Sequence, residues 1–234
     1  MIISLLLIGM GLLFNQQTKP PLFNGIFIPQ PTPFSSFSLV DHNNKVFNND
    51  NLTGTWSLLS YGYTHCPDIC PTTLNVLNKF VLLLEKDPKF NKLQILFYSI
   101  DHKRDTVERL GEYIPFFNSN FIGLTHLDNE KGNKNAESFE KSLGLISLLK
   151  TIKDKKNTIN PAEQFNTVEE LEKKTSLDEP YTVGHGVMLY LINPQGNLQA
   201  VFKPFVGRGQ IQYFTQKQVY KDYIKVRKYF SERE

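Results

Sequence analysis

The pattern of apolar and polar positions divides this chain of 234 residues into three parts. Residues 1–14 are uncharged and almost wholly apolar, whereas residues 15–32 are rich in Pro, Gln and Asn, a composition that resists both helix and strand. From Pro33 onward, short apolar runs typical of buried strands alternate with segments whose apolar residues recur every three or four positions, as on a helix face. The pattern predicts one domain over residues 33–234.

The strand-like segments begin with a predicted β-hairpin, in which the apolar segments 37–40 and 45–47 flank the polar turn 41–44. Further strand-like runs follow at 56–61, 93–100, 121–124, 187–192 and 198–202. The last two are joined by a tight turn at 193–196, so we expect them to pair antiparallel.

Helical spacing marks four segments, 72–86, 104–117, 136–145 and about 210–230. The first is the best defined, since five apolar residues between Leu74 and Leu84 fall on one face. The second is expected to bend or end before Pro115, because proline lacks an N–H and clashes with the preceding turn.

The order of these elements predicts the fold class. Strand–helix–strand alternation followed by a late antiparallel pair is typical of an α/β sandwich with a mixed central sheet flanked by helices. Because both cysteines lie between the first long strand and its helix, we expect this sandwich to be thioredoxin-like. With 40% hydrophobic and 21% charged residues, the chain is long enough for one core. We expect an N-terminal β-hairpin on this sandwich and a membrane anchor before it.

The anchor is predicted from residues 1–14. As a helix they would span about 21 Å, short of a bilayer core of about 30 Å. No Lys or Arg precedes the run and no small-residue cleavage site follows it, so we interpret it as an uncleaved signal-anchor, with residues 15–32 as a Pro-rich tether. A cleaved signal peptide and a tail docked on its own core are the alternatives.

Charge adds two expectations. The net charge of +3, without a basic stretch interleaved with aromatic residues, does not indicate nucleic-acid binding. Residues 150–181 hold six lysines and seven acidic residues but only one aromatic residue before Tyr181. We interpret residues 150–180 as a charged surface insertion of the domain, with a partner-docking loop as the alternative.

Both cysteines of the chain, Cys66 and Cys70, lie in the segment CPDICPT (66–72). Their spacing is not the CxxC of a dithiol enzyme, and a zinc ribbon would need a second pair. Cysteines at i and i+4 at a helix start would face the same way about 6 Å apart, which suits a soft ion such as Cu(I) or a disulfide. A thiol motif between a strand and its helix is the thioredoxin arrangement, in which the helix N-terminus stabilises the first thiolate. Two inert buried thiols are the alternative.

A third ligand would come from the five histidines of the chain. Four of them fall in turns, at strand ends or beside a cysteine: His42, His65, His102 and His126. His185 stands between two glycines directly before the strand 187–192, and glycines let the backbone approach another segment closely. His185 is therefore the candidate third ligand, with a structural histidine as the alternative.

The segment YTHCPDICPT (63–72) resembles the signature of the SCO/SenC family, copper-binding proteins that assemble cytochrome c oxidase. Asp101, the segment 104–106 and His185 extend the resemblance over about residues 34–205. The resemblance implies that Cys66, Cys70 and His185 bind a copper ion, Cu(I) or Cu(II), and that Asp101 is a polar neighbour of the site.

The chain also departs from the family pattern. His102 stands where proline is usual, His126 where glycine is usual and Gly186 where serine or threonine is usual, and the charged segment is longer. None of these differences removes a ligand; they bear on the choice of partner and on any secondary role of His102 and His126.

The implied function is that of a metallochaperone, not an enzyme, that delivers copper to the dinuclear centre of cytochrome c oxidase subunit II. Its other partners would be a copper donor protein and a thiol reductant, because a Cys66–Cys70 disulfide would abolish binding. The competing hypothesis is a thiol–disulfide oxidoreductase, which needs both cysteines but not His185. A thiol peroxidase is disfavoured, since Thr64 stands two residues before Cys66, not three, and no proline precedes it nearby.

The anchor further implies a location in the inner (cytoplasmic) membrane, with the domain facing the periplasm. The mitochondrial inner membrane, with the domain in the intermembrane space, is the alternative. An arginine-rich presequence is absent from the first residues, which favours the bacterial location.

Overall fold

The computed structural model describes residues 19–145, 187–207 and 211–231. The strands in them are β1 Gly25–Pro33, β2 Ser38–Asp41, β3 Val46–Asn48, β4 Trp56–Gly62, β5 Leu93–Ser99, β6 Ile122–Thr125, β7 Leu189–Ile192, β8 Asn197–Phe202, β9 Phe205–Val206 and β10 Gln212–Tyr213. The helices are the 3-10 helix η1 Asn49–Leu52 and the α-helices α2 Ile69–Leu84, α3 Val107–Phe117, α4 Glu130–Leu143 and α7 Gln216–Ser231.

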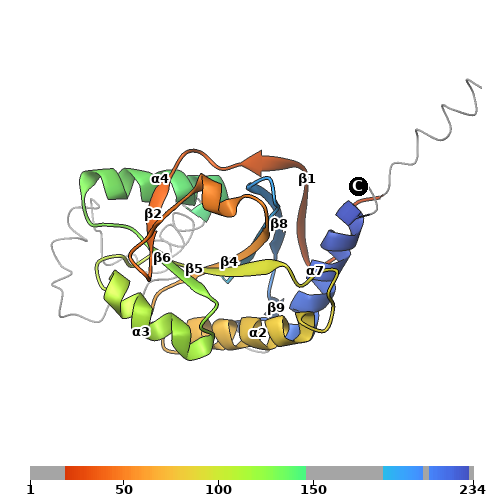
Figure 1. Ribbon diagram of the computed structural model, residues 1–234. Helices are drawn as coiled ribbons and strands as arrows, with labels where there is room; N and C mark the ends of the chain where they lie inside the picture. The colour runs from red at the N-terminus through yellow and green to blue at the C-terminus, as the bar shows by residue number, and fades with distance from the viewer. Residues whose placement is uncertain (1–18, 146–186, 208–210, 232–234) are drawn as a thin grey trace, which may run out of the picture.

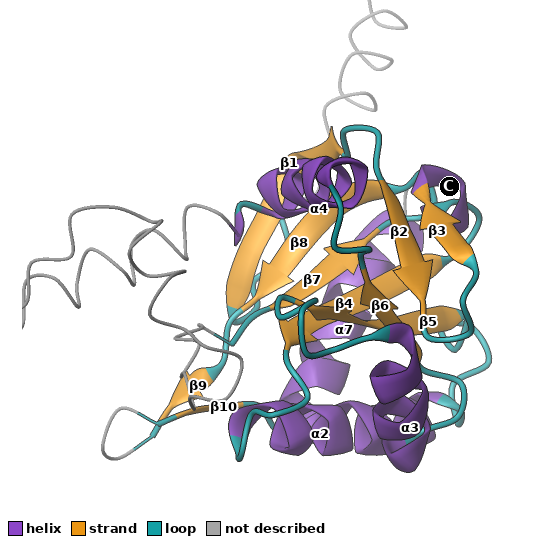
Figure 2. Ribbon diagram, turned by 90° about the vertical axis from the view of Figure 1, so that its left-hand side faces the viewer, coloured by secondary structure: helices purple, strands orange, loops and turns teal. Residues whose placement is uncertain are grey.

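Eight of the described strands form one sheet in the order β1-β8-β7-β4-β5-β6-β2-β3 (Figure 1, with all eight labelled in Figure 2). The three strands β4, β5 and β6 run parallel, and every other pairing in this sheet is antiparallel. The sheet is therefore mixed, as predicted. The remaining two described strands, β9 and β10, pair with each other in a separate short hairpin.

Helices cover both faces of this sheet. Figures 1 and 2 show α2, α3 and α7 on one face and α4 on the other. Since successive side chains of a strand point to opposite faces, Leu58 packs under α2 and α7, whereas Leu59 packs under α4. All seven residues of β4 are buried, including Ser57 and Ser60, because helices cover both faces of the sheet at this central strand. The two cores make the predicted thioredoxin-like sandwich.

Most predicted elements are confirmed. The hairpin lies at β2 and β3, the three long strand-like runs lie at β4, β5 and β7, and β8 pairs antiparallel with β7. The helix predicted at 72–86 begins three residues earlier, at Ile69. The helix α4 begins six residues before its predicted start, because the Asn129 side chain accepts a hydrogen bond from the Gly132 N–H and caps it.

The prediction that residues 15–32 resist helix and strand is wrong from Gly25 onward. Here β1 pairs with β8 at the edge of the sheet. The two prolines at 29 and 31 fall in an irregular stretch of this pairing, between Phe27 and Thr32. An edge strand tolerates proline because some of its N–H groups need no partner strand.

Two further details differ from the predictions. The helix α3 begins at Val107 instead of 104, and of the two alternatives at Pro115 the early end is wrong, since the helix runs through Pro115 to its predicted end at Phe117. Only one helical bond is lost there, and the face of Leu110, Ile114 and Phe117 is buried. The last helix begins at Gln216 instead of about 210, since β10 precedes it.

Three predicted features lie outside the described residues: the apolar segment 1–14, the charged insertion 150–180 and the candidate ligand His185. Within the described ranges, no helix is both long and apolar enough to cross a bilayer.

Candidate metal centre

The candidate site lies at one edge of the sheet. Since β4, β5 and β6 run parallel, their carboxyl ends meet there, and the loops that follow them carry Cys66, Asp101 and His126. The antiparallel β7 begins at the same edge, because Leu189 at its start pairs with Ser60 near the end of β4. Ligands of such folds bind outside the carboxyl ends of the parallel strands.

The two cysteines meet at the N-terminus of α2. Cys70 is the second residue of the helix, and Cys66 lies two residues before its N-cap, Asp68. The Cys70 N–H, which belongs to the first turn, donates to Cys66 Sγ at 3.4 Å. The prediction that the cysteine motif lies at a helix N-terminus is therefore confirmed. The two thiols do not share one face of the helix, because Cys66 lies before it. The chain before the helix turns back instead, and the Cys66 N–H donates to the Tyr63 carbonyl at 3.2 Å.

Burial controls the acidity of the Cys70 thiol. Both residues are buried, with exposed fractions of 7% for Cys66 and 4% for Cys70, and both are thiols, not a disulfide. Burial, followed by a hydrogen bond with Cys66, raises the pKa of the Cys70 thiol far above its ordinary value. Burial likewise raises the pKa of Tyr61 and Tyr113, and the nearby Cys70 charge adds to it. A second thiolate here needs a cation, which a bound metal ion would supply.

A glycine at the end of β4 makes room for the sulfur. A Cβ atom at Gly62 would lie 2.5 Å from Cys70 Sγ and 3.2 Å from a ring carbon of Phe97. No side chain fits at that distance, so the sulfur of Cys70 packs directly against the strand backbone.

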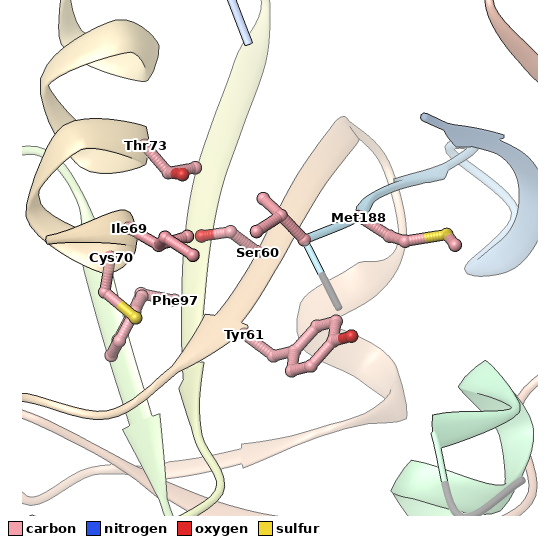
Figure 3. Close-up of a pocket in the computed structure, with 8 residues that line it drawn as sticks. Ser60, Tyr61, Ile69, Cys70, Thr73, Phe97 and Met188 are labelled. Atoms are coloured by element: carbon pink, nitrogen blue, oxygen red, sulfur yellow. The ribbon is translucent and has the colours of Figure 1, made fainter. Parts of the chain in front are cut away.

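A small pocket opens beside Cys70 (Figure 3). Its lining residues are Ser60, Tyr61, Ile69, Cys70, Thr73, Phe97, Val187 and Met188. Figure 3 shows Cys70 at the start of α2 beside Phe97 of β5. Val187 is 7% exposed and shares the hydrophobic core with both cysteines. The segment that enters β7 therefore packs beside the thiols.

A buried carboxylate fixes the loop that carries the cysteines. Asp105 is fully buried, and its Oδ2 accepts hydrogen bonds from the Thr64 N–H at 2.8 Å and from the Ser99 hydroxyl at 2.6 Å. Its Oδ1 accepts from the Thr64 hydroxyl at 2.6 Å. Hydrogen bonds to a charged acceptor are stronger than neutral ones, so this carboxylate ties the loop after β5 to the loop after β4.

The predicted polar neighbour, Asp101, is 3% exposed and bound to an arginine. Arg104 Nε donates to Asp101 Oδ2 at 2.5 Å, and the Arg104 guanidinium lies over the Tyr63 ring, 5.8 Å from its centroid. Asp101 therefore acts on the cysteine loop through Arg104 and Tyr63.

The structure thus brings two of the three predicted ligands together, and His185 lies outside the described residues. Elsewhere in the described ranges, no three His, Cys, Asp or Glu side chains gather closely enough to hold a metal ion. The pattern of the sequence did not reveal Gly62 and Asp105 as site residues. Asp105 stands in the segment 104–106 that carried the family resemblance, which was its only sequence signal.

Comparisons with known proteins agree on one family. The family model SCO1/SenC matches residues 29–143. The SCO2-like protein RP587 of Rickettsia prowazekii is 34% identical over 210 residues, which cover 86% of this chain and 87% of that protein.

Two solved structures share the fold. Yeast Sco1 with copper bound gives a TM-score of 0.60 at 23% identity, over 85% of this chain and 90% of that one. ScoI of Arabidopsis thaliana with copper bound gives a TM-score of 0.56 at 24% identity, over 84% and 99%.

Proposed function

The chain belongs to the SCO1/SenC family, and on that premise we propose that it binds a copper ion through Cys66, Cys70 and His185 and delivers it to cytochrome c oxidase. The acceptor would be the dinuclear copper centre of subunit II. One observation carries the proposal: two buried thiols meet at a helix N-terminus, where the Cys70 N–H already donates to Cys66 Sγ.

The chemistry of the donor set fits copper. Two thiolates and one imidazole suit Cu(I), which accepts few and soft ligands, and a further ligand would allow Cu(II). A structural zinc site would ask for four protein ligands. Because the Cys70 thiol resists ionisation in the metal-free protein, binding of the ion releases its proton, and loading is favoured at higher pH.

Chain connectivity supports His185 as the third ligand. Val187, which lines the pocket with Cys70, is two residues away, and two residues span at most about 7 Å. The glycines on both sides of His185 let the backbone approach the thiols.

Transfer would proceed by ligand exchange. Thiolates of the acceptor replace Cys66, Cys70 and His185 one at a time, and the released ligands take up protons, so the oxidation state of the ion does not change. A copper donor protein loads the site, and a thiol reductant keeps the two cysteines reduced. We propose residues 1–14 as the anchor that holds the domain at the inner membrane, facing the periplasm, with the mitochondrial inner membrane as the alternative.

The second candidate is a thiol–disulfide oxidoreductase that reduces the cysteines of the acceptor. The same hydrogen bond favours it, because the Cys70 N–H stabilises a nucleophilic Cys66 thiolate. This function does not require His185, which separates the two candidates.

The test is an anaerobic Cu(I) competition titration of the reduced chain beside His185→Ala and Cys66→Ala. We expect one tightly bound equivalent in the parent chain and at least a hundredfold weaker binding in both variants. His42→Gln is the matched control, since His42 Nδ1 accepts from the Gly123 N–H away from the thiols and should leave Cu(I) affinity unchanged. If His185→Ala binds Cu(I) like the parent chain, the three-ligand site is wrong and the reductase becomes the better proposal.

A further inference from the structure

Two histidines that the thiol site does not use lie in contact at the same edge of the sheet. His102 follows β5 and His126 follows β6, and their ring centroids are 3.9 Å apart with an interplanar angle of 36°. These residues stand 24 positions apart in the sequence, so only the parallel pairing of β5 and β6 brings them together.

His126 is buried, and one of its ring nitrogens has no hydrogen-bond partner in the described part of the chain. Its exposed fraction is 7%, and its Nδ1 atom has no hydrogen-bond partner among the described residues. A buried nitrogen without a partner costs free energy whether it carries a proton or a lone pair. Burial, followed by the charge of His102, lowers the pKa of His126 to about 4, so the ring is neutral at pH 7 and keeps a lone pair.

His102 has a carboxylate on one side. Its Nε2 lies 3.3 Å from Asp128 Oδ1, and an imidazole that donates this N–H to a carboxylate carries its lone pair on Nδ1. The same arrangement orients histidines that bind metal ions through their other nitrogen. The Asp128 side chain is 61% exposed and His102 is 20% exposed, so solvent reaches this side of the pair.

We propose that His102 and His126 form a second metal site, which binds Cu²⁺ through two imidazole nitrogens. Asp128 orients His102, and water fills the remaining positions. Among divalent first-row ions Cu²⁺ binds a given set of nitrogen ligands most tightly, and imidazole suits it better than it suits Cu(I). Because no third protein ligand joins the pair in the described residues, the ion is held weakly and exchanges readily.

The second site is separate from the cysteines but connected to them by one loop. Residues 100–106 carry His102 at one end and Asp105, which holds Thr64 of the cysteine loop, at the other. Arg104 of this loop also lies over Tyr63. The histidine pair is therefore linked to the thiol site through this loop but shares no ligand with it.

The test uses the full chain with Cys66→Ala, Cys70→Ala and His185→Ala, so that the thiol site is absent and no thiol reduces Cu²⁺. Cu²⁺ alone is titrated at pH 7 and followed by electron paramagnetic resonance. We expect one equivalent whose spectrum shows superhyperfine coupling to two imidazole nitrogens. His102→Gln in this background should weaken Cu²⁺ binding at least tenfold and reduce the coupling to one nitrogen. His65→Gln, at a histidine with 48% side-chain exposure, is the control and should change neither.

His126→Gln should have the same effect as His102→Gln. Because His126 is buried, its variant can fail to fold, and in that case the variant of the partly exposed His102 decides the outcome. Circular dichroism of each chain checks the fold. Two results would show that the pair is a structural stack only and overturn the proposal. One is a Cu²⁺ affinity of the His102→Gln chain within threefold of that of the chain with the three substitutions alone. The other is a spectrum of the latter chain without coupling to two nitrogens. The Cu(I) titration of the thiol site is measured in chains that retain His102 and His126, so either proposal can fail alone.

Discussion

The Thr64 hydroxyl donates a hydrogen bond of 2.6 Å to Asp105 Oδ1, between residues 41 positions apart in the sequence. The same carboxylate accepts hydrogen bonds from the Thr64 N–H and the Ser99 hydroxyl, and His65 Nδ1 lies 3.8 Å from its Oδ1. Cys66 follows Thr64 by two residues. The position of the cysteine loop therefore depends on a buried charge that belongs to a different loop.

Replacement of this carboxylate by an amide should destabilise the fold. In Asp105→Asn the bonds to a charged acceptor become weaker neutral ones, and an Nδ2 group at the Oδ2 position would face the Thr64 N–H, which cannot accept. We expect the free energy of unfolding to fall by about 2–4 kcal/mol, measured by urea denaturation. Glu112→Gln, at a side chain 76% exposed on α3, is the control and should change it by less than about 0.5 kcal/mol. Equal effects of the two substitutions would contradict the assigned role of Asp105.

Addition of one methyl group at Gly62 should displace the Cys70 sulfur. The new Cβ would lie 2.5 Å from Cys70 Sγ, so the helix start or the strand end must move. We expect Gly62→Ala to lower Cu(I) affinity at least tenfold in the competition titration. Ser60→Ala, in the same strand and lining the same pocket, adds no atoms and should bind Cu(I) like the parent chain. An unchanged affinity in Gly62→Ala would mean that the sulfur can move at no cost to binding.

Removal of β1 should destabilise the domain although its sequence resembles a tether. The Phe27 ring packs edge-on against Tyr229 of α7, with centroids 4.9 Å apart, and the Phe23 ring packs against Phe202 at 5.4 Å. A fragment that begins at Phe34 loses both contacts and exposes the edge of β8. We expect it to unfold at least about 3 kcal/mol more easily than a fragment that begins at Pro20. Coincident urea transitions of the two fragments would show that β1 adds no stability.

A partly buried carboxyl group on α4, that of Glu140, should make stability depend on pH. Burial raises the pKa of Glu140, whose Oε1 accepts a hydrogen bond from the Tyr98 hydroxyl at 2.7 Å. Because the folded protein holds this proton more tightly than the unfolded chain, stability falls as the pH rises from about 4.5 through the raised pKa. Glu140→Gln keeps an acceptor for Tyr98 without the charge.

We expect Glu140→Gln to be more stable than the parent chain by about 1 kcal/mol at pH 7 and equally stable at pH 4. Urea denaturation at both pH values measures the difference. Glu137→Gln, at the exposed neighbour whose charge adds to the raised pKa, should give only a small part of this gain. A Glu140→Gln chain that is less stable than its parent at pH 7 would show that the carboxylate form is the favoured one.

Local patterns were sufficient for most of the fold. The strand at 56–61 was predicted from its short, mostly apolar run, which is buried because helices cover both faces of the sheet. The helix α2 was predicted because its apolar residues recur at helical spacing. The cysteine motif was equally local, since both thiols stand within one segment at a strand–helix junction. Its exact geometry was not, because Cys66 lies outside the helix and meets Cys70 through an N–H bond.

What the sequence by itself determined is therefore what neighbouring residues decide together: the strands and helices, and a pair of soft ligands at a helix start. Only the tertiary structure decided that a proline-rich segment becomes the edge strand β1, that Asp105 holds Thr64, and that His102 stacks on His126. Each of these depends on which strands lie side by side in the sheet. Strand pairing joins residues far apart in the chain, and no local periodicity records it.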